Sequence, residues 1–403
     1  MSPSRDVGTH PRSLLAYQRD PYLRKLETNV RAAGHDENGN WVELTDTILY
    51  PEGGGQPADH GWIGAAAVID VQHVSNTIRH VIDGEPPQGR VEVAVDWDRR
   101  FDHMQQHTGQ HLLTAVALDR FGFRTTAFHL GPEVSDIELD NPGIQTTTLR
   151  EIEAAVAAEI RAARSVRDRW VMPEAMANLP VRTRGLPEGH SGLVRLVEID
   201  DLDLNTCGGT HLRSTAELET IALVGTEPMR GGTRVHFVFG GRVRSRLAAH
   251  EQRGALLRDL LGAPDADLPA VAELKLEQLK QAQREGRRLR EQLAELLAGG
   301  LTASMDPVAT CHLDAGQVDL LRPLASRLAG GCGPAAFLLA ADDGTFAVAL
   351  GESCTIEVTE LGQLVAKILE GKGGGRNRLF QGKADHPELL EAAAAAVRDA
   401  LRN

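Results

Sequence analysis

The stretch His103-Met-Gln-Gln-His107-Thr-Gly-Gln-His111-Leu-Leu decides how the fold of this chain is interpreted. Its pattern predicts a helix over residues 103–121, with Asp102 as the N-cap. Side chains four residues apart lie on one face of a helix, one turn above the other. We therefore expect His107 and His111 to direct two imidazoles toward one point.

A second pair of side chains of the metal-binding type stands far downstream, in Cys207-Gly-Gly-Thr-His211. Its two glycines argue against a helix and for a tight loop. Three imidazoles and one thiolate form the nitrogen and sulfur donor set that zinc prefers. Each half alone is more often an ordinary structural feature, so the prediction of one zinc ion per chain depends on both halves together. The predicted ligands are His107, His111, Cys207 and His211.

This donor set leaves the chemistry of the ion open. Four protein ligands are typical of a closed structural zinc site, whereas a catalytic zinc keeps one position for water or substrate. His103 lies one turn before His107, where it could replace that ligand or support it through a hydrogen bond. Either the ion expands its coordination, or one protein ligand is not bound throughout. That ligand would be Cys207, or His103 in exchange with His107. An open position would let the ion activate water, polarise an ester carbonyl or anchor an amino group.

Four motifs follow one another along the chain. They are "YPEGGGQPADHG" at 50–61, "HTGQHLL" at 107–113, "TTAFHLG" at 125–131 and "CGGTH" at 207–211. Together they resemble the editing domain of alanyl-tRNA synthetase. They resemble more closely the AlaX family of free-standing editing proteins, which consist of that domain without the synthetase. The resemblance covers residues 20–245 and continues more weakly to the C-terminus.

The resemblance implies a trans-editing hydrolase, which removes mischarged serine, and secondarily glycine, from tRNA(Ala) by zinc-dependent ester hydrolysis. No adenylate-forming or Walker-type motif precedes the resembling region, so we do not expect the chain to charge tRNA. A pocket built for alanine cannot strongly reject an added hydroxyl, which is why a second site is useful. Two alternatives remain: a zinc-stabilised, non-catalytic tRNA-binding module, and a zinc hydrolase of a small ester or amide.

The resemblance also assigns residues to the substrate. A glycine-rich loop permits close backbone approach to a ligand, and in the family this loop faces the zinc site, so that Gln56 is a candidate for contacting the terminal ribose or the ester. The first threonine of "TTAFHLG" lines the amino-acid pocket in the family and favours serine over alanine. Its neighbour is also a threonine here, which leaves open which hydroxyl faces the pocket. The predicted substrate-binding residues are Gly54, Gly55, Gln56, Thr125 and Thr126, with Gln56 and Thr125 as the catalytic candidates.

The pattern of short strands and helices predicts an α+β fold. Short β-type runs before residue 99 indicate a small β-barrel, and the next part alternates helices with strands of an antiparallel sheet. A helical region interrupted at Gly262-Ala-Pro264 leads to a C-terminal α/β domain, which resembles the DHH-associated domain of alanyl-tRNA synthetase. The predicted segments are a disordered tail at 1–14, the barrel at 15–99, the zinc-binding editing domain at 100–245, a helical spacer at 246–300 and the C-terminal domain at 301–403.

Composition limits the partners. The net charge of −13 argues against nonspecific nucleic-acid binding, although clustered basic residues could still bind tRNA. One such cluster is the arginine-dense stretch 161–184, and the other follows a glycine run near the C-terminus, with Lys372, Arg376 and Arg378 as the predicted tRNA contacts. The chain has no membrane-length apolar segment, so we expect a cytoplasmic enzyme with mischarged tRNA(Ala) as its partner and no membrane. A homodimer through the helical spacer or the C-terminal domain is compatible with the pattern.

Overall fold

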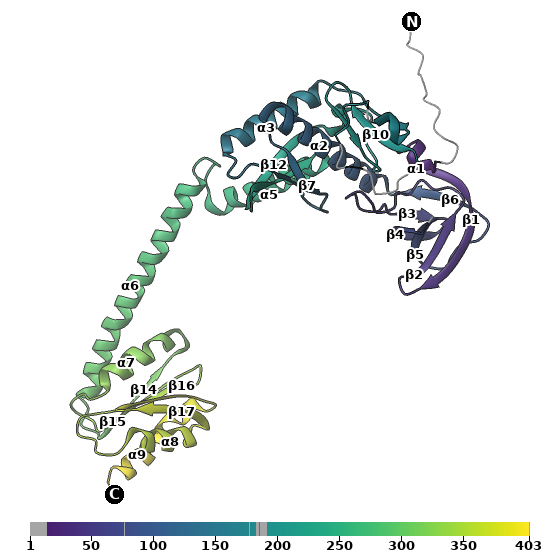
Figure 1. Cartoon of the computed structure of the whole chain (residues 1–403). Coiled ribbons are helices and arrows are strands. Elements are labelled where there is room, and N and C mark those ends of the chain that lie inside the picture. The colour runs from purple at the N-terminus through teal and green to yellow at the C-terminus, as the bar shows by residue number, and fades with distance from the viewer. Residues whose placement is uncertain (1–13, 76, 177, 183–184, 186–191, 403) are drawn as a thin grey trace. The chain divides into compact units, whose positions relative to one another are not determined.

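The computed structural model describes residues 14–402 except 76, 177, 183–184 and 186–191 (Figure 1). The chain divides into two compact units, Met1–Gly254 and Ala255–Asn403. The predicted tail up to residue 13, and Arg184 at the end of the predicted basic stretch, lie outside the described residues. Within the described part of the chain, no helix has the length and apolar character needed to cross a membrane.

A closed antiparallel barrel, of strand order β1-β2-β5-β4-β3-β6, forms the N-terminal part of the first unit. Alternate side chains turn into its core, and Val91, Val93 and Val95 of β6 are at most 7% exposed. The short helix α1, Ala16–Arg19, contributes two further residues to this core. The predicted small barrel is thus confirmed. Its strands are β1 Lys25–Asp36, β2 Gly39–Leu44, β3 Gly61–Ile63, β4 Ala66–Val74, β5 Thr77–Asp83 and β6 Arg90–Val95.

Helix α2, Trp97–Phe121, follows the barrel and begins six residues earlier than predicted. The predicted start at His103, with Asp102 as the cap, is wrong. The cap is Asp96, whose side chain accepts a backbone N–H at 3.2 Å. Asp102 instead forms an ion pair with Arg242, with 2.7 Å between nitrogen and oxygen. The earlier start places both predicted ligand histidines well inside the helix, away from its fraying end.

Two antiparallel sheets pack with α2 and α3 around one hydrophobic core. One sheet has the strand order β12-β13-β8-β7 and the other has the order β11-β10-β9. This arrangement confirms the predicted α+β fold. Its elements are β7 Thr125–His129, β8 Ser135–Leu139, α3 Thr146–Arg161, β9 Val166–Val171, α4 Pro173–Met176, β10 Val194–Ile199, β11 Asp203–Thr206, η1 Thr215–Leu218, β12 Ile221–Met229 and β13 Gly232–Phe239.

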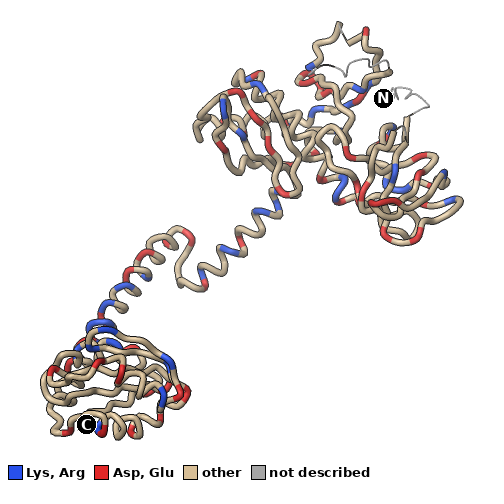
Figure 2. The backbone as a smooth tube through the Cα atoms, turned by 60° about the horizontal axis from the view of Figure 1, so that its bottom comes forward, with Lys and Arg blue, Asp and Glu red and all other residues tan. Residues whose placement is uncertain are grey.

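In the sequence, two helices separated at Gly262 follow the last strand of the first unit and precede the first strand of the second unit. Helix α5, Gly241–Leu261, ends where Gly262 adopts a φ of 66°, and α6, Leu268–Thr302, begins after the proline. The predicted break is therefore confirmed. Charges of both signs follow α6 (Figure 2), and Arg287 pairs with Glu291 one turn later at 3.1 Å. Such a pattern is typical of a helix whose surface faces solvent.

The second unit is built on a five-stranded sheet of order β14-β15-β16-β18-β17. The first two strands are parallel and the other neighbours are antiparallel. This sheet with its helices confirms the predicted C-terminal α/β region, whereas the exact segment boundaries stay predictions. Its elements are β14 Val308–Leu313, η2 Ala315–Leu320, α7 Leu321–Leu328, β15 Ala336–Ala341, β16 Thr345–Leu350, α8 Val358–Ile368, β17 Gly371–Arg376, β18 Leu379–Ala384, η3 Pro387–Leu389 and α9 Leu390–Ala400.

Candidate metal centre

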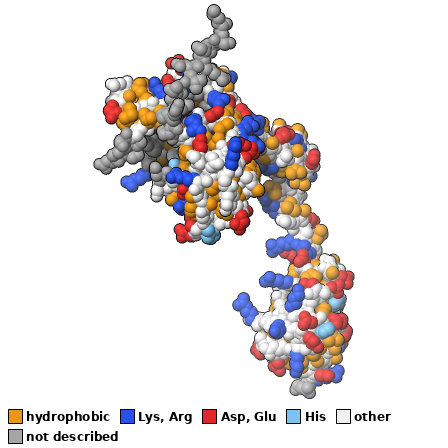
Figure 3. All heavy atoms as spheres, turned by 90° about the vertical axis from the view of Figure 1, so that its right-hand side faces the viewer, with side chains coloured by type: hydrophobic (Ala, Val, Ile, Leu, Met, Phe, Trp, Pro, Cys, Tyr) orange, Lys and Arg blue, Asp and Glu red, His pale blue; other side chains and the backbone are white. Residues whose placement is uncertain are grey.

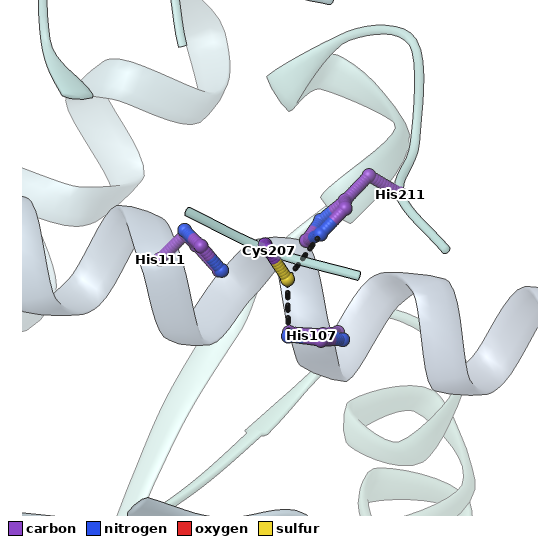
Figure 4. Close-up of side chains that lie close together, drawn as sticks. All are labelled: His107, His111, Cys207 and His211. Carbon is purple, nitrogen blue, oxygen red and sulfur yellow. Dashed lines mark hydrogen bonds between the residues drawn. The ribbon is translucent and has the colours of Figure 1, made fainter. Parts of the chain in front are cut away.

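The four predicted metal ligands lie together in the first unit. His107 and His111 come from α2, one turn apart, and Cys207 and His211 come from the loop after β11 (Figure 4). One potential ligand atom from each residue lies within 4.8 Å of those of the other three. Tetrahedral zinc with sulfur and nitrogen ligands places neighbouring ligand atoms about 3.5 Å apart. Cys207 Sγ lies 3.3 Å from His107 Nε2 and 3.2 Å from His211 Nε2, so the spacing fits such an ion.

The glycines of the 207–211 loop allow its backbone to approach α2. A Cβ atom on Gly209 would lie 2.3 Å from the His107 ring, so a larger residue would push the loop away from the helix. Arg195, which is buried on β10, donates from Nη1 to the carbonyl oxygens of Cys207 at 3.2 Å and Gly209 at 2.5 Å. The guanidinium group of Arg195 therefore helps to hold the tight loop that was expected from the sequence.

Each ligand histidine is oriented by a different side chain through its outer ring nitrogen. The Nδ1 of His107 lies 2.8 Å from Gln56 Oε1. The Nδ1 of His111 lies 3.4 Å from Asp203 Oδ2, and that of His211 lies 3.2 Å from Thr108 Oγ1. Hydrogen bonds of this kind fix the tautomer and the ring direction of metal-binding histidines. The Nε2 atoms are thereby left to face the cluster.

Asp203 and Thr108 were not predicted from the sequence. Thr108 directly follows His107, and Asp203 precedes Cys207 by four residues. Proximity to a motif was thus the available signal, but neither residue type is diagnostic of a ligand partner, because threonine and aspartate are common throughout helices, strands and loops. The pairing becomes visible when α2 and β11 are placed side by side.

The charge state of the cluster suits a cation. Burial alone would raise the pKa of the Cys207 thiol, but the adjacent His107 and His211 together lower that pKa well below its usual value. The thiolate is the form of cysteine that binds metal. His103 does not belong to this four-residue cluster. Burial, and then the nearby Arg99, lower the pKa of His103 to about 4, so that this side chain is neutral near pH 7.

Gln56 lies beside the metal ligands, on the side to which the glycine-rich loop was expected to bring it. The side chain is fully buried, and Oε1 accepts a hydrogen bond from Thr210 N at 3.0 Å besides facing His107. Its Nε2 donates to Thr210 Oγ1 at 2.8 Å. The amide thus joins the barrel loop to both halves of the metal centre. A direct contact with substrate stays a prediction.

Similarity to known proteins identifies the family. Residues 194–236 match the model of the threonyl and alanyl tRNA synthetase second additional domain. The chain is 35% identical, over 91% of its length, to alanyl-tRNA editing protein Aarsd1 of Danio rerio, of which it covers 89%. It is also 35% identical, over 95% of its length, to Aarsd1 of Mus musculus, of which it covers 97%. The chain belongs to the alanyl-tRNA editing proteins.

A longer enzyme shares this region of sequence. The alanine–tRNA ligase of Thermococcus kodakarensis is 29% identical over 97% of this chain, which covers 44% of the ligase. This match and the family membership confirm the resemblance to the free-standing AlaX proteins. In this member of the editing-protein family, the other predicted site residues lie in two separate places.

The glycine loop and β7 lie close to each other beside the metal ligands. Gly54 and Gly55 have φ values of 55° and 81°, which favour glycine. A Cβ atom on Gly55 would lie 2.7 Å from the ring of Phe128, and that ring is 6.3 Å from the His107 ring. The structure thus brings the predicted glycine loop to the edge of the metal centre.

The two adjacent threonines of this editing protein point to different neighbours. Thr125 Oγ1 lies 3.1 Å from Thr114 Oγ1 on α2, the helix that carries two of the metal ligands. Thr126 is exposed, and its Oγ1 donates to the carbonyl oxygen of Glu138 on β8 at 3.3 Å. The side chain that faces the ligand helix is therefore Thr125.

Two of the predicted tRNA contacts, Lys372 and Arg376, lie on the glycine-rich edge strand β17 of the second unit, and Arg378 lies in the turn after it. Lys372 and Arg376 are exposed. Arg378, by contrast, directs its guanidinium to backbone carbonyl oxygens, among them those of Gly351 and, at 3.5 Å, Cys354. The first two side chains are available to a partner, whereas the third is already used within the fold.

Proposed function

We propose that this chain is a zinc-dependent deacylase that acts in trans on tRNA(Ala) mischarged with serine, and secondarily with glycine. The observation that carries the proposal is the cluster of His107, His111, Cys207 and His211 in a chain that aligns over nearly its whole length with proteins named for alanyl-tRNA editing. Family membership supports the tRNA(Ala) substrate. The nitrogen and sulfur donors support zinc rather than magnesium or calcium, which prefer oxygen ligands.

The residues of the chain have distinct roles in this proposal. The three imidazoles and the Cys207 thiolate hold the ion, and Gln56, Asp203 and Thr108 keep the imidazoles turned toward it. Zinc, when bound, supplies Lewis acidity toward water or an ester carbonyl. The glycine loop at Gly54 and Gly55 offers backbone amides beside the cluster, where the terminal ribose of the tRNA would approach.

Thr125 is proposed to line the amino-acid pocket, because it faces α2 beside the ligand histidines. Pockets that select by size alone separate substrates differing by one small group by about 1–3 kcal/mol. A pocket that hydrogen-bonds a hydroxyl can separate them more strongly, because an analogue without the hydroxyl leaves polar protein groups unpaired. This physical difference supports serine as the preferred substrate over correctly attached alanine.

The second unit is proposed to bind the tRNA body. A cleft of about 740 Å³ adjoins β17, and its described lining includes three arginines and no carboxylate, in a chain with a net charge of −13. Basic side chains project from the C-terminal unit in Figure 3. The lining consists of Arg322, Ser326, Ala329, Gly374, Gly375, Arg376, Asn377, Arg378, Leu379 and Gln381.

A glycine in this cleft supports close approach of a phosphate. A Cβ atom on Gly371, Gly373 or Gly375 would lie within 2.5 Å of a backbone oxygen of β18, so packing explains these three glycines. No described atom lies within 4 Å of a Cβ placed on Gly374. A side chain would fit there within the fold. Its absence leaves the backbone between Lys372 and Arg376 open to a ligand.

Self-association and location complete the proposal. Six leucines on α6 are at least 40% exposed, which supports a contact between two copies through this helix. They are Leu274, Leu276, Leu279, Leu289, Leu293 and Leu296. An enzyme that removes amino acids from tRNA works where tRNA is charged and used, so the proposed compartment is the cytoplasm.

The decisive experiment measures deacylation of seryl-tRNA(Ala) and alanyl-tRNA(Ala) by the unaltered protein and by Cys207→Ala, with the zinc content of each determined. We expect rapid loss of serine, little loss of alanine, and a fall of at least 100-fold in the Cys207→Ala rate together with lower zinc content. A substitution of the exposed Cys332 by alanine is the matched control and should change neither quantity.

Two results would redirect the proposal. If zinc is bound but both esters survive, the chain is a zinc-stabilised binding module. If a small serine ester is hydrolysed as efficiently as seryl-tRNA(Ala), the enzyme is a hydrolase of small esters, and the tRNA body has no part in its specificity.

A further inference from the structure

A cavity in the first unit lies between the arginine-dense stretch that the sequence singled out and the segment that begins at the ligand His211. Its volume is about 260 Å³, and its described lining comes from β9, β10, the end of α1 and residues 211–213. Arg167 of the arginine-dense stretch is part of this lining. A water molecule occupies about 30 Å³ in the liquid, so the cavity has room for a small ionic group with part of its hydration.

Positive charges outnumber negative ones around this cavity. Four arginines and two aspartates belong to its described lining, which leaves an excess of two positive charges. These residues are Arg19, Arg167, Arg195, Arg213, Asp20 and Asp168. The excess is local, because the whole chain has a net charge of −13. It favours a negatively charged ligand, and we call this site the arginine cavity.

Both aspartates of the arginine cavity already have an arginine partner. Asp168 lies 3.1 Å from Arg195 Nε, and Asp20 lies 2.9 Å from Arg213 Nη2. Arg167 donates from Nε to Ser165 Oγ at 3.1 Å and forms no ion pair with another described residue. An anion in the cavity can therefore contact the Arg167 guanidinium group without displacing a carboxylate.

Arg195 contributes a buried guanidinium group to the arginine cavity. Its side chain is 7% exposed. Its Nε donates to Asp168, and its Nη1 donates to the carbonyl oxygens of Cys207 and Gly209. Its Nη2 has no hydrogen-bond partner within the described part of the chain. Because an unpaired donor of a buried charged group is costly, this Nη2 is suited to donate to a ligand in the cavity.

Guanidinium groups from three different segments match a ligand with acceptor oxygens in several directions. Arg167 comes from β9, Arg195 from β10 and Arg213 from the segment after His211. A phosphate group has three or more such oxygens, and arginine forms paired hydrogen bonds with them. We propose that the arginine cavity binds a phosphate group through Arg167, Arg195 and Arg213.

Two sources can supply this phosphate group, a backbone phosphodiester of the tRNA substrate and free inorganic phosphate. The tRNA is favoured because the cavity adjoins the ligand His211, and the terminal nucleotide of tRNA carries a phosphate next to the ribose that bears the amino acid. Arg195 would then contact both the phosphate and the loop of Cys207 and His211. The tRNA source rests on the proposed deacylase function, whereas the phosphate site itself does not.

The test measures the Kd of inorganic phosphate for the zinc-loaded full-length protein by isothermal titration calorimetry, with chloride holding the ionic strength constant. We expect Arg167→Gln to raise this Kd about tenfold, because it removes charge-assisted hydrogen bonds to the anion. Arg161→Gln is the matched control, since it removes an exposed arginine of the same stretch that does not line the cavity. Arg376→Gln accounts for any phosphate bound beside β17 and should leave the binding that depends on Arg167 intact.

Deacylation of seryl-tRNA(Ala) distinguishes the two sources of the phosphate group. If a tRNA phosphate occupies the arginine cavity, inorganic phosphate should raise the KM of the unaltered protein without changing kcat. Arg167→Gln should then have a KM about tenfold higher, which no longer responds to phosphate. If free phosphate is the ligand, the calorimetric difference between Arg167→Gln and Arg161→Gln persists, but phosphate leaves KM unchanged.

Two calorimetric results would overturn the inference. Either the unaltered protein does not bind inorganic phosphate, or Arg167→Gln binds it as tightly as Arg161→Gln does. The arginines of the cavity would then serve only to hold the barrel, β9 and the metal loop together. Failure of the proposed function is recognised separately, because seryl-tRNA(Ala) would survive with the unaltered protein whatever the affinity for phosphate.

Discussion

Gln56 connects the N-terminal barrel to the candidate metal centre through side-chain hydrogen bonds. Its amide contacts His107 on α2 and Thr210 in the loop between the other two ligands. Both of its polar atoms are used in these bonds. We therefore expect Gln56 to act on zinc binding and catalysis indirectly, by setting the orientation of the His107 ring.

For Gln56→Ala we expect zinc affinity to fall about 10- to 100-fold, because partners of metal-binding histidines contribute on this scale. Competition with a chromogenic chelator measures the affinity. Gln72→Ala serves as the control, since that amide contacts Asp70 within the barrel. Unchanged zinc affinity together with abolished deacylation would instead show that Gln56 acts directly on the substrate.

At the scale of elements, the barrel and α2 are joined by a fully buried ion pair. Arg100 and Asp59 have side chains with 0% exposure, and Arg100 also donates to the carbonyl oxygens of Pro21 and Ile48. Asp59 accepts in addition from Tyr50 N at 2.7 Å. These bonds fix the glycine loop, which lies between Tyr50 and Asp59, against the helix that carries His107.

We expect Arg100→Met to lower the free energy of unfolding of the first unit by about 3–5 kcal/mol, because it leaves a buried carboxylate without its partner. Urea titration followed by tryptophan fluorescence measures the change. Lys25→Met breaks the exposed pair with Glu92 and should cost no more than about 1 kcal/mol. Equal losses in the two variants would contradict this account.

The sequence predicted the elements of the site better than their contacts. The i, i+4 spacing of His107 and His111 and the glycines before His211 are local features, and the structure confirms that these residues come together with Cys207. The start of α2 was misplaced because the side chain of Asp102 is occupied by an ion pair with Arg242, far along the chain, while Asp96 caps the helix. Local patterns do not contain such tertiary partners.

The same reason explains why the partners of the ligands were missed. Asp203 reaches His111 because β11 lies beside α2, and Thr108 reaches His211 because the 207–211 loop lies against the same helix. The family, by contrast, was accessible from the order of four motifs, since each is short and local. Both polar atoms of the Gln56 side chain have hydrogen-bond partners in the fold, and this could be recognised only with all its neighbours in place.

At the scale of the whole molecule, an acidic chain is proposed to bind an acidic partner through a local basic surface. We expect Arg322→Glu/Arg376→Glu to weaken tRNA binding, and to reduce the slope of log Kd against log salt by about one for each tRNA phosphate that is no longer neutralised. Filter binding at several salt concentrations measures both quantities. Lys367→Glu, an exposed basic residue of α8 outside the cleft, is the control.

The salt slope distinguishes a direct contact from a general charge effect. The double variant is four charges more negative than the unaltered chain, and Lys367→Glu changes the charge by two in the same sense. If affinity falls in proportion to net charge alone, with equal effect per charge in both proteins, the cleft beside β17 is not the contact surface.

The division of the four ligands between α2 and the 207–211 loop has a consequence for the synthesis of the protein. Ribosomes release a chain from its N-terminus, so His107 and His111 emerge about a hundred residues before Cys207 and His211. A chain that stops before residue 207 therefore carries only half of the ligand set, and we expect it to bind zinc far more weakly than the complete first unit.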